Sequence, residues 1–364
     1  CPLPDHRHVH DIQFIRHLRS HFSVVGAFAM QVKRTMWIAI IIVALLVLAA
    51  IVYLASLKGD FQVKRSREIA APPAQVFAAI VDFKSWPQWS PWLIHEPGAE
   101  INYSDKFQQE GGYFSWDGER VGAGKLSHLD IKPNHSIRQE IEFTRPFKSI
   151  NQVHWSFEEK QDSTIVSWEM IGKMPFFLRF MVKQMEPMIG RDYELGLALL
   201  NGYVNAEAAH PQISFIEREE LADFFYWAIP LQGNLRQLET ARKGDIATLE
   251  AAAEGQAGLP LCLYHHFDPG QLKYDAEIAI PVAENAPASN YTRRQFHGGL
   301  YFKMHLRGAH EFLPLGWYAL ISHCRMHKIR LDFERPSLEI YNNDPSSCEN
   351  SNQVLSTLYI AIRK

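Results

Sequence analysis

The longest apolar run in the chain covers residues 36–57, none of which carries a charged side chain. A bilayer core is crossed by about 20 apolar residues, so this run predicts a transmembrane helix. A signal peptide is the alternative, but its apolar region is shorter and ends at a site of small residues, which is not clear here. Trp37 and Tyr53 lie near the two ends of the run, where amphipathic rings favour the membrane interface. The pattern therefore predicts an uncleaved, single-pass membrane anchor.

Basic residues are balanced across this run, with Lys33 and Arg34 directly before it and Lys58 and Lys64 after it. The positive-inside rule reads orientation from an excess of such residues on one side. Because Lys33 and Arg34 adjoin the run like the basic region of a signal anchor, we expect the following domains on the extracytoplasmic side.

Residues 1–29 show no sustained period, and the first methionine is Met30. The simpler interpretation is a non-native extension ahead of the true start, to be excluded from fold reasoning. A metal-binding tail is the alternative, because five histidines fall within the first 21 residues.

Between residues 61 and 208, apolar and polar side chains alternate with a period of two in several segments. This alternation is typical of antiparallel strands with one covered and one wet face. Residues 72–83 predict a short helix, and residues 176–206 predict a long one with a kink or a second start at Pro187. The order predicts an α+β domain in which an antiparallel sheet wraps on a long C-terminal helix.

The apolar sides of these elements are rich in Trp, Phe and Met, which are wide or flexible and leave gaps that a ligand can fill. A methionine stripe at helical spacing also suits an ordinary core, so both interpretations stay open. The residues expected to line a ligand cavity are Phe143, Trp155, Trp168, Met181 and Met185.

This part of the chain resembles the SRPBCC superfamily, the START-like and polyketide-cyclase-type helix-grip domains. The resemblance covers residues 61–208 and rests on FQVKRSREIAAPPAQVFAAIVDFKSWPQWSPW and on MEPMIGRDYELGLALLNGYV. It implies a deep apolar cavity between the sheet and the C-terminal helix, used for lipids, polyketides or other hydrophobic molecules. Some members are cyclases or related enzymes, and many only bind their ligands.

Beyond the linker NAEAAHPQ, residues 212–364 show two weakly similar halves, each with a helix, a strand, an acidic-Pro turn and a second strand. The pattern predicts a duplicated α+β unit. The second half, with GGLYFKMHLRGAHEFLPLGWYALISHC and RPSLEIYNNDP, resembles the GyrI-like, AraC-type effector-binding domain. That resemblance implies a small-molecule pocket between the half-repeats, which multidrug-sensing members use to detect lipophilic cations.

Glu339 in LEIY matches the pocket glutamate of this family. A carboxylate buried in an apolar pocket is costly unless a positive group pairs with it, and a cationic ligand supplies such a group. Aromatic faces add cation–π attraction. Alternation alone also permits a solvated Glu339 between two core-facing neighbours, so the pocket role is what the resemblance implies. The aromatic residues expected beside it are Tyr301, Trp317, Tyr318 and Tyr341.

Composition and motifs exclude several classes of function. The chain of 364 residues has a formal net charge of −3, and neither large segment is basic or carries a helix-turn-helix pattern, so we expect no nucleic-acid partner. The four cysteines form no CxxC pair, which argues against a zinc site or a disulfide framework. No nucleotide fingerprint or metal constellation appears, so we expect no cofactor. His128 and His154 are the titratable candidates in the first domain, but no catalytic motif is recognisable.

The hypothesis that follows is a membrane-anchored binding protein for hydrophobic or lipophilic-cationic small molecules, which senses, sequesters or transfers them. The absence of a catalytic motif favours binding over catalysis. One alternative is a cyclase or a small-molecule hydrolase with Glu339 as base and a tyrosine as its partner. A second alternative is a regulatory module that binds a protein, which the sequence does not identify.

Overall fold

The computed structural model describes residues 36–253, 257–268, 273–286 and 290–363. Residues 1–29, interpreted above as an extension, lie outside these described residues. Contacts within the chain define two compact units. The anchor unit contains residues 36–59 together with Met174–Val182, and the main unit contains Asp60–Lys173 and the chain from Lys183 onward.

The anchor unit is built on one long helix, Met36–Ser56. Its side chains are exposed along almost its whole length. Within the described part of the chain, it is the one helix that is long and apolar enough to cross a membrane. The predicted helical element is therefore present, and it ends one residue before the end of the apolar run.

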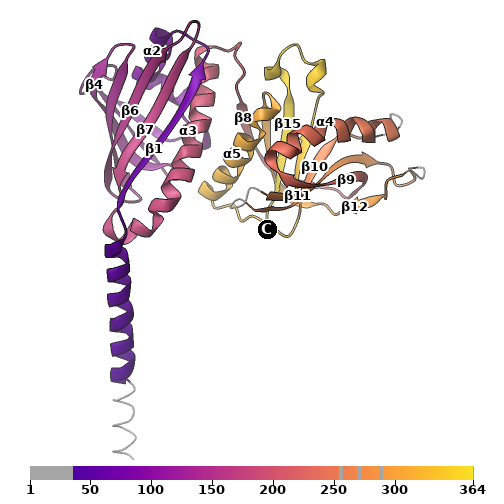
Figure 1. The fold of residues 1–364 in the computed structure, drawn as a ribbon, viewed down its shortest axis with the longest axis horizontal. Helices are drawn as coiled ribbons and strands as arrows, with labels where there is room; N and C mark the ends of the chain where they lie inside the picture. The colour runs from indigo at the N-terminus through magenta and orange to yellow at the C-terminus, as the bar shows by residue number, and fades with distance from the viewer. Residues whose placement is uncertain (1–35, 254–256, 269–272, 287–289, 364) are drawn as a thin grey trace, which may run out of the picture. The chain divides into compact units, whose positions relative to one another are not determined.

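The first part of the main unit, residues 60–173 and 183–204, is called the helix-grip domain below. Its seven strands form one antiparallel sheet in the order β1-β7-β6-β5-β4-β3-β2, and helix α3 lies across one face of it (Figure 1). The short helices α2, η1 and η2 connect β1 to β2. The elements are β1 (Asp60–Ile69), α2 (Pro73–Val81), η1 (Phe83–Gln88), η2 (Leu93–His95), β2 (Glu100–Tyr103), β3 (Tyr113–Gly118), β4 (Gly122–Lys132), β5 (Ser136–Arg145), β6 (Ser149–Glu159), β7 (Thr164–Lys173) and α3 (Val182–Val204).

The core of this domain is a cluster of aromatic rings between sheet and helix. Trp155 on β6 is the cross-strand partner of Trp168 on β7, and their rings stack 4.3 Å apart. Tyr193 on α3 stacks on Trp168 at 3.9 Å. Trp86 in η1 and Trp89 directly after it meet this stack, and all five rings are at most 3% exposed. The period-two pattern correctly predicted which side chains point inward.

The long helix predicted over residues 176–206 is divided in the structure. A 3-10 helix η3 (Phe176–Met181) comes first, and α3 then runs without interruption through Pro187 to Val204. Pro187 is the sixth residue of α3, and its missing N–H removes one intrahelical hydrogen bond without ending the helix. Of the two predicted alternatives, the structure shows the second helix start, at Val182, five residues before Pro187.

His128 is part of a buried polar chain within this core rather than a reactive group. Its ring stacks on Phe83 at 4.1 Å, and its Nε2 lies 3.1 Å from the carbonyl oxygen of Val81. The Gln139 amide lies 3.3 Å from His128 Nδ1, and Trp155 donates to Gln139 Oε1 at 2.9 Å. Burial lowers the pKa of His128 from 6.5 to about 4, so the ring is neutral at physiological pH.

This depressed pKa predicts a contribution to acid sensitivity. Because His128 binds its proton near pH 6.5 in the unfolded chain and near pH 4 in the folded one, its stabilisation is complete above pH 6.5 and is lost as the pH falls. Between pH 7 and pH 5 the expected loss is about 2 kcal/mol in the free energy of unfolding. Urea unfolding at both pH values measures it. In His128→Gln, which cannot titrate, the loss should shrink by about that amount, and an unchanged loss contradicts the assignment.

The second part of the main unit, residues 212–363, is called the C-terminal domain. Its eight strands form one sheet in the order β12-β9-β11-β10-β14-β15-β13-β8. Helix α4 packs on β9 and β11, and helix α5 packs on β13 and β15 (Figure 1). The elements are β8 (Gln212–Leu221), β9 (Phe224–Asn234), α4 (Leu235–Ala252), β10 (Leu261–Asp268), β11 (Lys273–Val282), β12 (Arg294–Phe296), β13 (Gly299–Arg307), η4 (His310–Phe312), α5 (Leu313–Met326), β14 (Ser337–Tyr341) and β15 (Leu355–Ala361).

This sheet has an internal two-fold arrangement. The elements β9-α4-β10-β11 and β13-α5-β14-β15 follow each other as two β-α-β-β units. Their strands occupy mirrored places on either side of the β10–β14 pair, while β8 and β12 extend the two edges. The predicted duplicated α+β unit is confirmed. The centre of the sheet is thus formed by LCLY (residues 261–264) of one half and LEIY (residues 338–341) of the other, paired antiparallel.

Candidate ligand-binding site

Glu339 lies at the centre of the C-terminal sheet. Its Cα is paired with that of Cys262 on β10, where the two half-repeats meet, and with that of Leu358 on β15. It shares a face with Cys262 and Leu358, which belong to the apolar core on the side of the helices. Glu339 is only 1% exposed. The alternation of apolar and polar residues was also compatible with a Glu339 side chain in solvent, and the structure excludes that interpretation.

Three side chains donate hydrogen bonds to the Glu339 carboxylate. The Tyr341 hydroxyl lies 2.7 Å from Oε1, the indole Nε1 of Trp317 lies 2.7 Å from Oε2, and the Tyr264 hydroxyl lies 3.2 Å from Oε2. They come from β14, α5 and β10, so both half-repeats contribute. Each donor is neutral, so these bonds orient the carboxylate without cancelling its charge.

The surroundings of this carboxylate are aromatic. The rings of Tyr264 and Trp317 meet edge to face with centroids 5.6 Å apart. The ring of His310 lies 5.3 Å from that of Tyr341. An acidic group among aromatic faces is the chemistry that recognises an apolar cation, because the rings attract positive charge and exclude water. Among the described residues, no cluster of His, Cys, Asp and Glu is arranged to hold a metal ion.

A second buried carboxylate of this domain has different partners. Glu277 on β11 is paired with Leu263 and therefore faces the opposite side of the sheet from Glu339. It forms an ion pair with Arg294, accepts a hydrogen bond from the Tyr226 hydroxyl at 3.1 Å, and lies 3.2 Å from His265 Nε2. Because Arg294 already balances its charge, Glu277 resembles an internal ion pair more than a site for a cationic ligand.

The five residues that were predicted to line a cavity in the helix-grip domain do not all lie together in the structure. Trp155 and Trp168 belong to the aromatic stack, and Met185 on α3 is 7% exposed. Phe143 on β5 is half-buried and packs edge-on against Trp116 at 5.8 Å. Met181 ends η3 in the anchor unit. The indole Nε1 of Trp168 and the hydroxyl of Tyr193 are buried without a hydrogen-bond partner in the described structure, so the stack keeps two unused donors.

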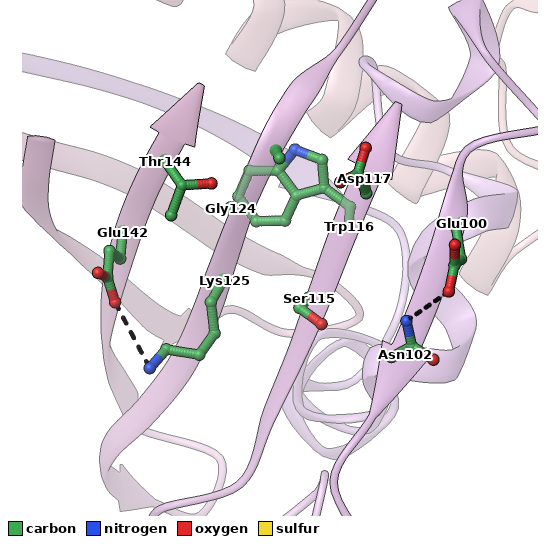
Figure 2. A pocket seen from close by; sticks show the side chains of 10 residues that line it. Glu100, Asn102, Ser115, Trp116, Asp117, Gly124, Lys125, Glu142 and Thr144 are labelled. Atoms are coloured by element: carbon green, nitrogen blue, oxygen red, sulfur yellow. Dashed lines mark hydrogen bonds and ion pairs between the residues drawn. The ribbon is translucent and has the colours of Figure 1, made fainter. Parts of the chain in front are cut away.

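A pocket of about 430 Å³ lies elsewhere on this domain, on strands β2 to β5 (Figure 2). Its lining mixes polar and apolar groups and includes three carboxylates, and Lys125 pairs with Glu142 at 3.5 Å within it. It therefore differs in place and chemistry from the apolar cavity that the resemblance implied. The lining residues are Glu100, Asn102, Ser115, Trp116, Asp117, Ala123, Gly124, Lys125, Glu142 and Thr144.

Comparison with known proteins agrees with this architecture. Residues 60–204 match the family described as polyketide cyclase / dehydrase and lipid transport. These residues form a domain of that family. The match spans the helix-grip domain from β1 to the end of α3, as the sequence resemblance predicted.

Solved structures resemble parts of the chain at low identity, and no curated protein matches it. The protein CV1439 from Chromobacterium violaceum is 14% identical, with 39% of this chain and 96% of that one covered and a TM-score of 0.30. SAV2435 bound to tetraphenylphosphonium is 16% identical, with 41% and 94% covered and a TM-score of 0.33. The C-terminal domain of EcmrR is 12% identical, with 42% and 98% covered and a TM-score of 0.35. The duplicated sheet of residues 212–363 is the fold that the resemblance to GyrI-like effector-binding domains implied.

The structure brings Trp317 and Tyr341 to Glu339 but not Tyr301. Along β13, Tyr301 alternates with Phe302 and Met304, which face the helices, and so it lies on the other side of the sheet. It is fully buried and donates to the carbonyl oxygen of Pro336 at 3.0 Å. Burial raises its pKa to about 12, which suits a structural hydroxyl.

Tyr318 also lies away from Glu339, although it follows Trp317 directly. Consecutive residues on a helix point about 100° apart, so the two rings leave α5 on different sides. The Tyr318 hydroxyl lies 2.8 Å from Asp192 Oδ1 and 3.1 Å from the Met188 carbonyl oxygen, both on α3. Trp92 donates to Asp192 Oδ2 at 3.1 Å. Burial raises the pKa of Asp192 to about 6, and these two donors act against that rise.

Among the described partners of the Glu339 carboxylate, Tyr264 was not predicted from the sequence. A signal was present, because LCLY and LEIY are equivalent segments of the two half-repeats. Aligning them places Tyr264 where Tyr341 stands in the second half, and Cys262 where Glu339 stands. Comparing the halves residue by residue predicts Tyr264 at the site, whereas comparing their element order does not.

These placements predict opposite effects for two neighbouring aromatic residues. Trp317→Phe removes a donor to Glu339 and should weaken binding of a lipophilic cation, whereas Tyr318→Phe should leave the cation affinity unchanged. Tyr318→Phe instead leaves the buried Asp192 with one donor fewer, which should cost about 1–3 kcal/mol in the free energy of unfolding. Cation titration and urea unfolding of both variants check this. Weakened cation binding in Tyr318→Phe, with unchanged stability, contradicts the assignment.

Proposed function

We propose that this chain is a membrane-anchored binding protein whose C-terminal domain takes up lipophilic cations at Glu339. The observation that carries the proposal is a carboxylate 1% exposed, at the centre of the sheet, with Tyr264, Trp317 and Tyr341 on its oxygens. A buried charge is expensive to maintain. A cation that reaches it gains both the charge pairing and the contact with aromatic faces.

The domain match supports binding of hydrophobic molecules rather than one named ligand. The family that matches residues 60–204 is described by cyclase, dehydrase and lipid-transport activities, which share large apolar substrates or cargo. In this chain the corresponding core is filled by stacked rings around Trp168, and the side chains of Trp168 and Tyr193 keep buried donors without partners. A fold does not fix a reaction, so we place recognition of the cation at Glu339.

The first prediction from this proposal concerns charge selectivity. Tetraphenylphosphonium should bind more tightly than neutral triphenylphosphine oxide, because only the cation pairs with the carboxylate. Glu339→Gln keeps the size of the side chain and removes its charge. It should therefore weaken binding of the cation by about tenfold or more, a loss of about 1.4 kcal/mol in binding free energy. Binding of the neutral molecule should not change. Tryptophan fluorescence of the full chain in detergent reports both titrations.

Glu277→Gln is the matched control for this experiment, since Glu277 is an equally buried carboxylate on the other face of the sheet. It should leave the cation affinity unchanged. Equal binding of the cation by the original chain and by Glu339→Gln contradicts the proposal. Conversion of a bound ligand to product, abolished in Glu339→Gln, identifies the enzyme alternative instead.

The helix Met36–Ser56 is proposed as the anchor that holds the domains at a bilayer. Its length of 21 residues matches the thickness of a hydrocarbon core. The protein should therefore remain with membranes during extraction at alkaline pH, while a variant without residues 36–57 should be released. For the orientation, we propose domains on the extracytoplasmic side. A membrane-impermeant maleimide should then label the partly exposed Cys348 in intact cells.

A further inference from the structure

The anchor unit contains a second apolar element besides its long helix. The segment Met174–Met181 reads MPFFLRFM, and its last six residues form the 3-10 helix η3. Phe176, Phe177 and Phe180 are 41%, 57% and 50% exposed. Three large aromatic side chains exposed within five residues are unusual for a surface in water and mark an interaction site.

Hydrogen bonds fix where this segment lies within the anchor unit. The backbone N–H of Met174 donates to the carbonyl oxygen of Gly59 at 2.9 Å. The Arg179 guanidinium donates to the carbonyl oxygen of Leu57 at 3.4 Å. Leu57 and Gly59 directly follow the helix Met36–Ser56. The phenylalanines are therefore held at the end of this helix, at the level where a spanning helix leaves the hydrocarbon core.

The side chains of this segment suit the interface between hydrocarbon and water. Aromatic rings are enriched at that depth in membrane proteins. The Arg179 guanidinium lies 5.1 Å from the ring centroid of Phe176, so the charge covers the apolar ring and keeps donors for lipid phosphate. Lys58, two residues after the helix Met36–Ser56, adds positive charge that anionic headgroups attract.

We infer that Met174–Met181 inserts into the interface of the leaflet from which the helix Met36–Ser56 emerges, with the three phenylalanine rings among the lipid acyl chains. The inference rests on the proposed membrane anchoring and deepens it. The occupant of this apolar surface is the bilayer itself, because the surface is continuous with the exposed apolar helix beside it. Val182, the next residue along the chain, begins α3.

Depth measurement by spin labelling tests this inference on the full chain in vesicles of phosphatidylcholine and phosphatidylglycerol. Single cysteines replace Phe177 or Phe180 in a background with Cys1 and Cys348 changed to Ser, since Cys262 and Cys324 are buried. Frequent collisions of the label with oxygen show that it lies in lipid, and frequent collisions with a water-soluble nickel chelate show that it lies in water. We expect the ratio of oxygen to nickel collisions to be severalfold higher at both positions than at the control.

The matched control is Phe333→Cys, because Phe333 is a phenylalanine 78% exposed in the C-terminal domain. Val47→Cys, in the middle of the helix Met36–Ser56, reports whether the anchor itself lies in lipid. If the label at position 47 reports lipid while the collision ratios at positions 177 and 180 equal that at position 333, the inference is overturned and the proposed anchor stands. If Val47 also reports water, both are overturned.

Discussion

The C-terminal domain depends on one buried charge placed where its two half-repeats meet. LCLY and LEIY pair antiparallel at the centre of the sheet, and in this register Cys262 and its equivalent Glu339 lie directly across from each other. Directly opposed side chains in such a pair are about 5 Å apart at Cβ. A glutamate in both halves would force two carboxylates together, at a high cost in a buried site. Cys262 stands opposite Glu339 instead, and a small apolar thiol leaves room for a single charge. The symmetric fold therefore supplies the aromatic donors from both halves, and the broken symmetry supplies the site.

The two domains differ in what fills the space between their sheet and the helices that cover it. In the helix-grip domain, Trp155, Trp168 and Tyr193 stack into that space and fill it with carbon. Removing one of these rings would cost about 3–5 kcal/mol, so they are a main source of the domain's stability. In the C-terminal domain, the apolar core on the side of the helices also holds the Glu339 carboxylate and its aromatic hydrogen-bond donors. The second core therefore combines apolar packing with one carboxylate, which the stacked rings of the first core lack.

Local patterns in the sequence predicted the elements well, because strand alternation and a continuous apolar run each depend on neighbouring residues alone. The site was predicted only in part, since it depends on which strand face meets which helix side. Tyr301 and Glu339 are both on strands of one sheet, but the register across β15 puts their side chains on opposite faces. Trp317 and Tyr318 are adjacent in sequence, and the helical rotation between them separates their partners. The place of Tyr264 at the carboxylate could be predicted only by aligning the two half-repeats residue by residue. The transition from η3 to α3 at Val182 had no signal as strong as Pro187, which a helix tolerates near its start.

Helix α5 links the carboxylate to the other domain of the main unit. Trp317 donates to Glu339, and the next residue, Tyr318, is hydrogen-bonded to Asp192 on α3. Two residues of one helical turn are rigidly coupled, because backbone hydrogen bonds fix their relative direction. A ligand that displaces Trp317 along with α5 must therefore shift Tyr318 against Asp192, unless the helix deforms. Burial keeps the Asp192 carboxylate poorly solvated, so the loss of a hydrogen-bond donor to it costs free energy and affects α3, which carries Asp192. The Glu339 carboxylate and the contact between α5 and α3 are therefore connected through one helix.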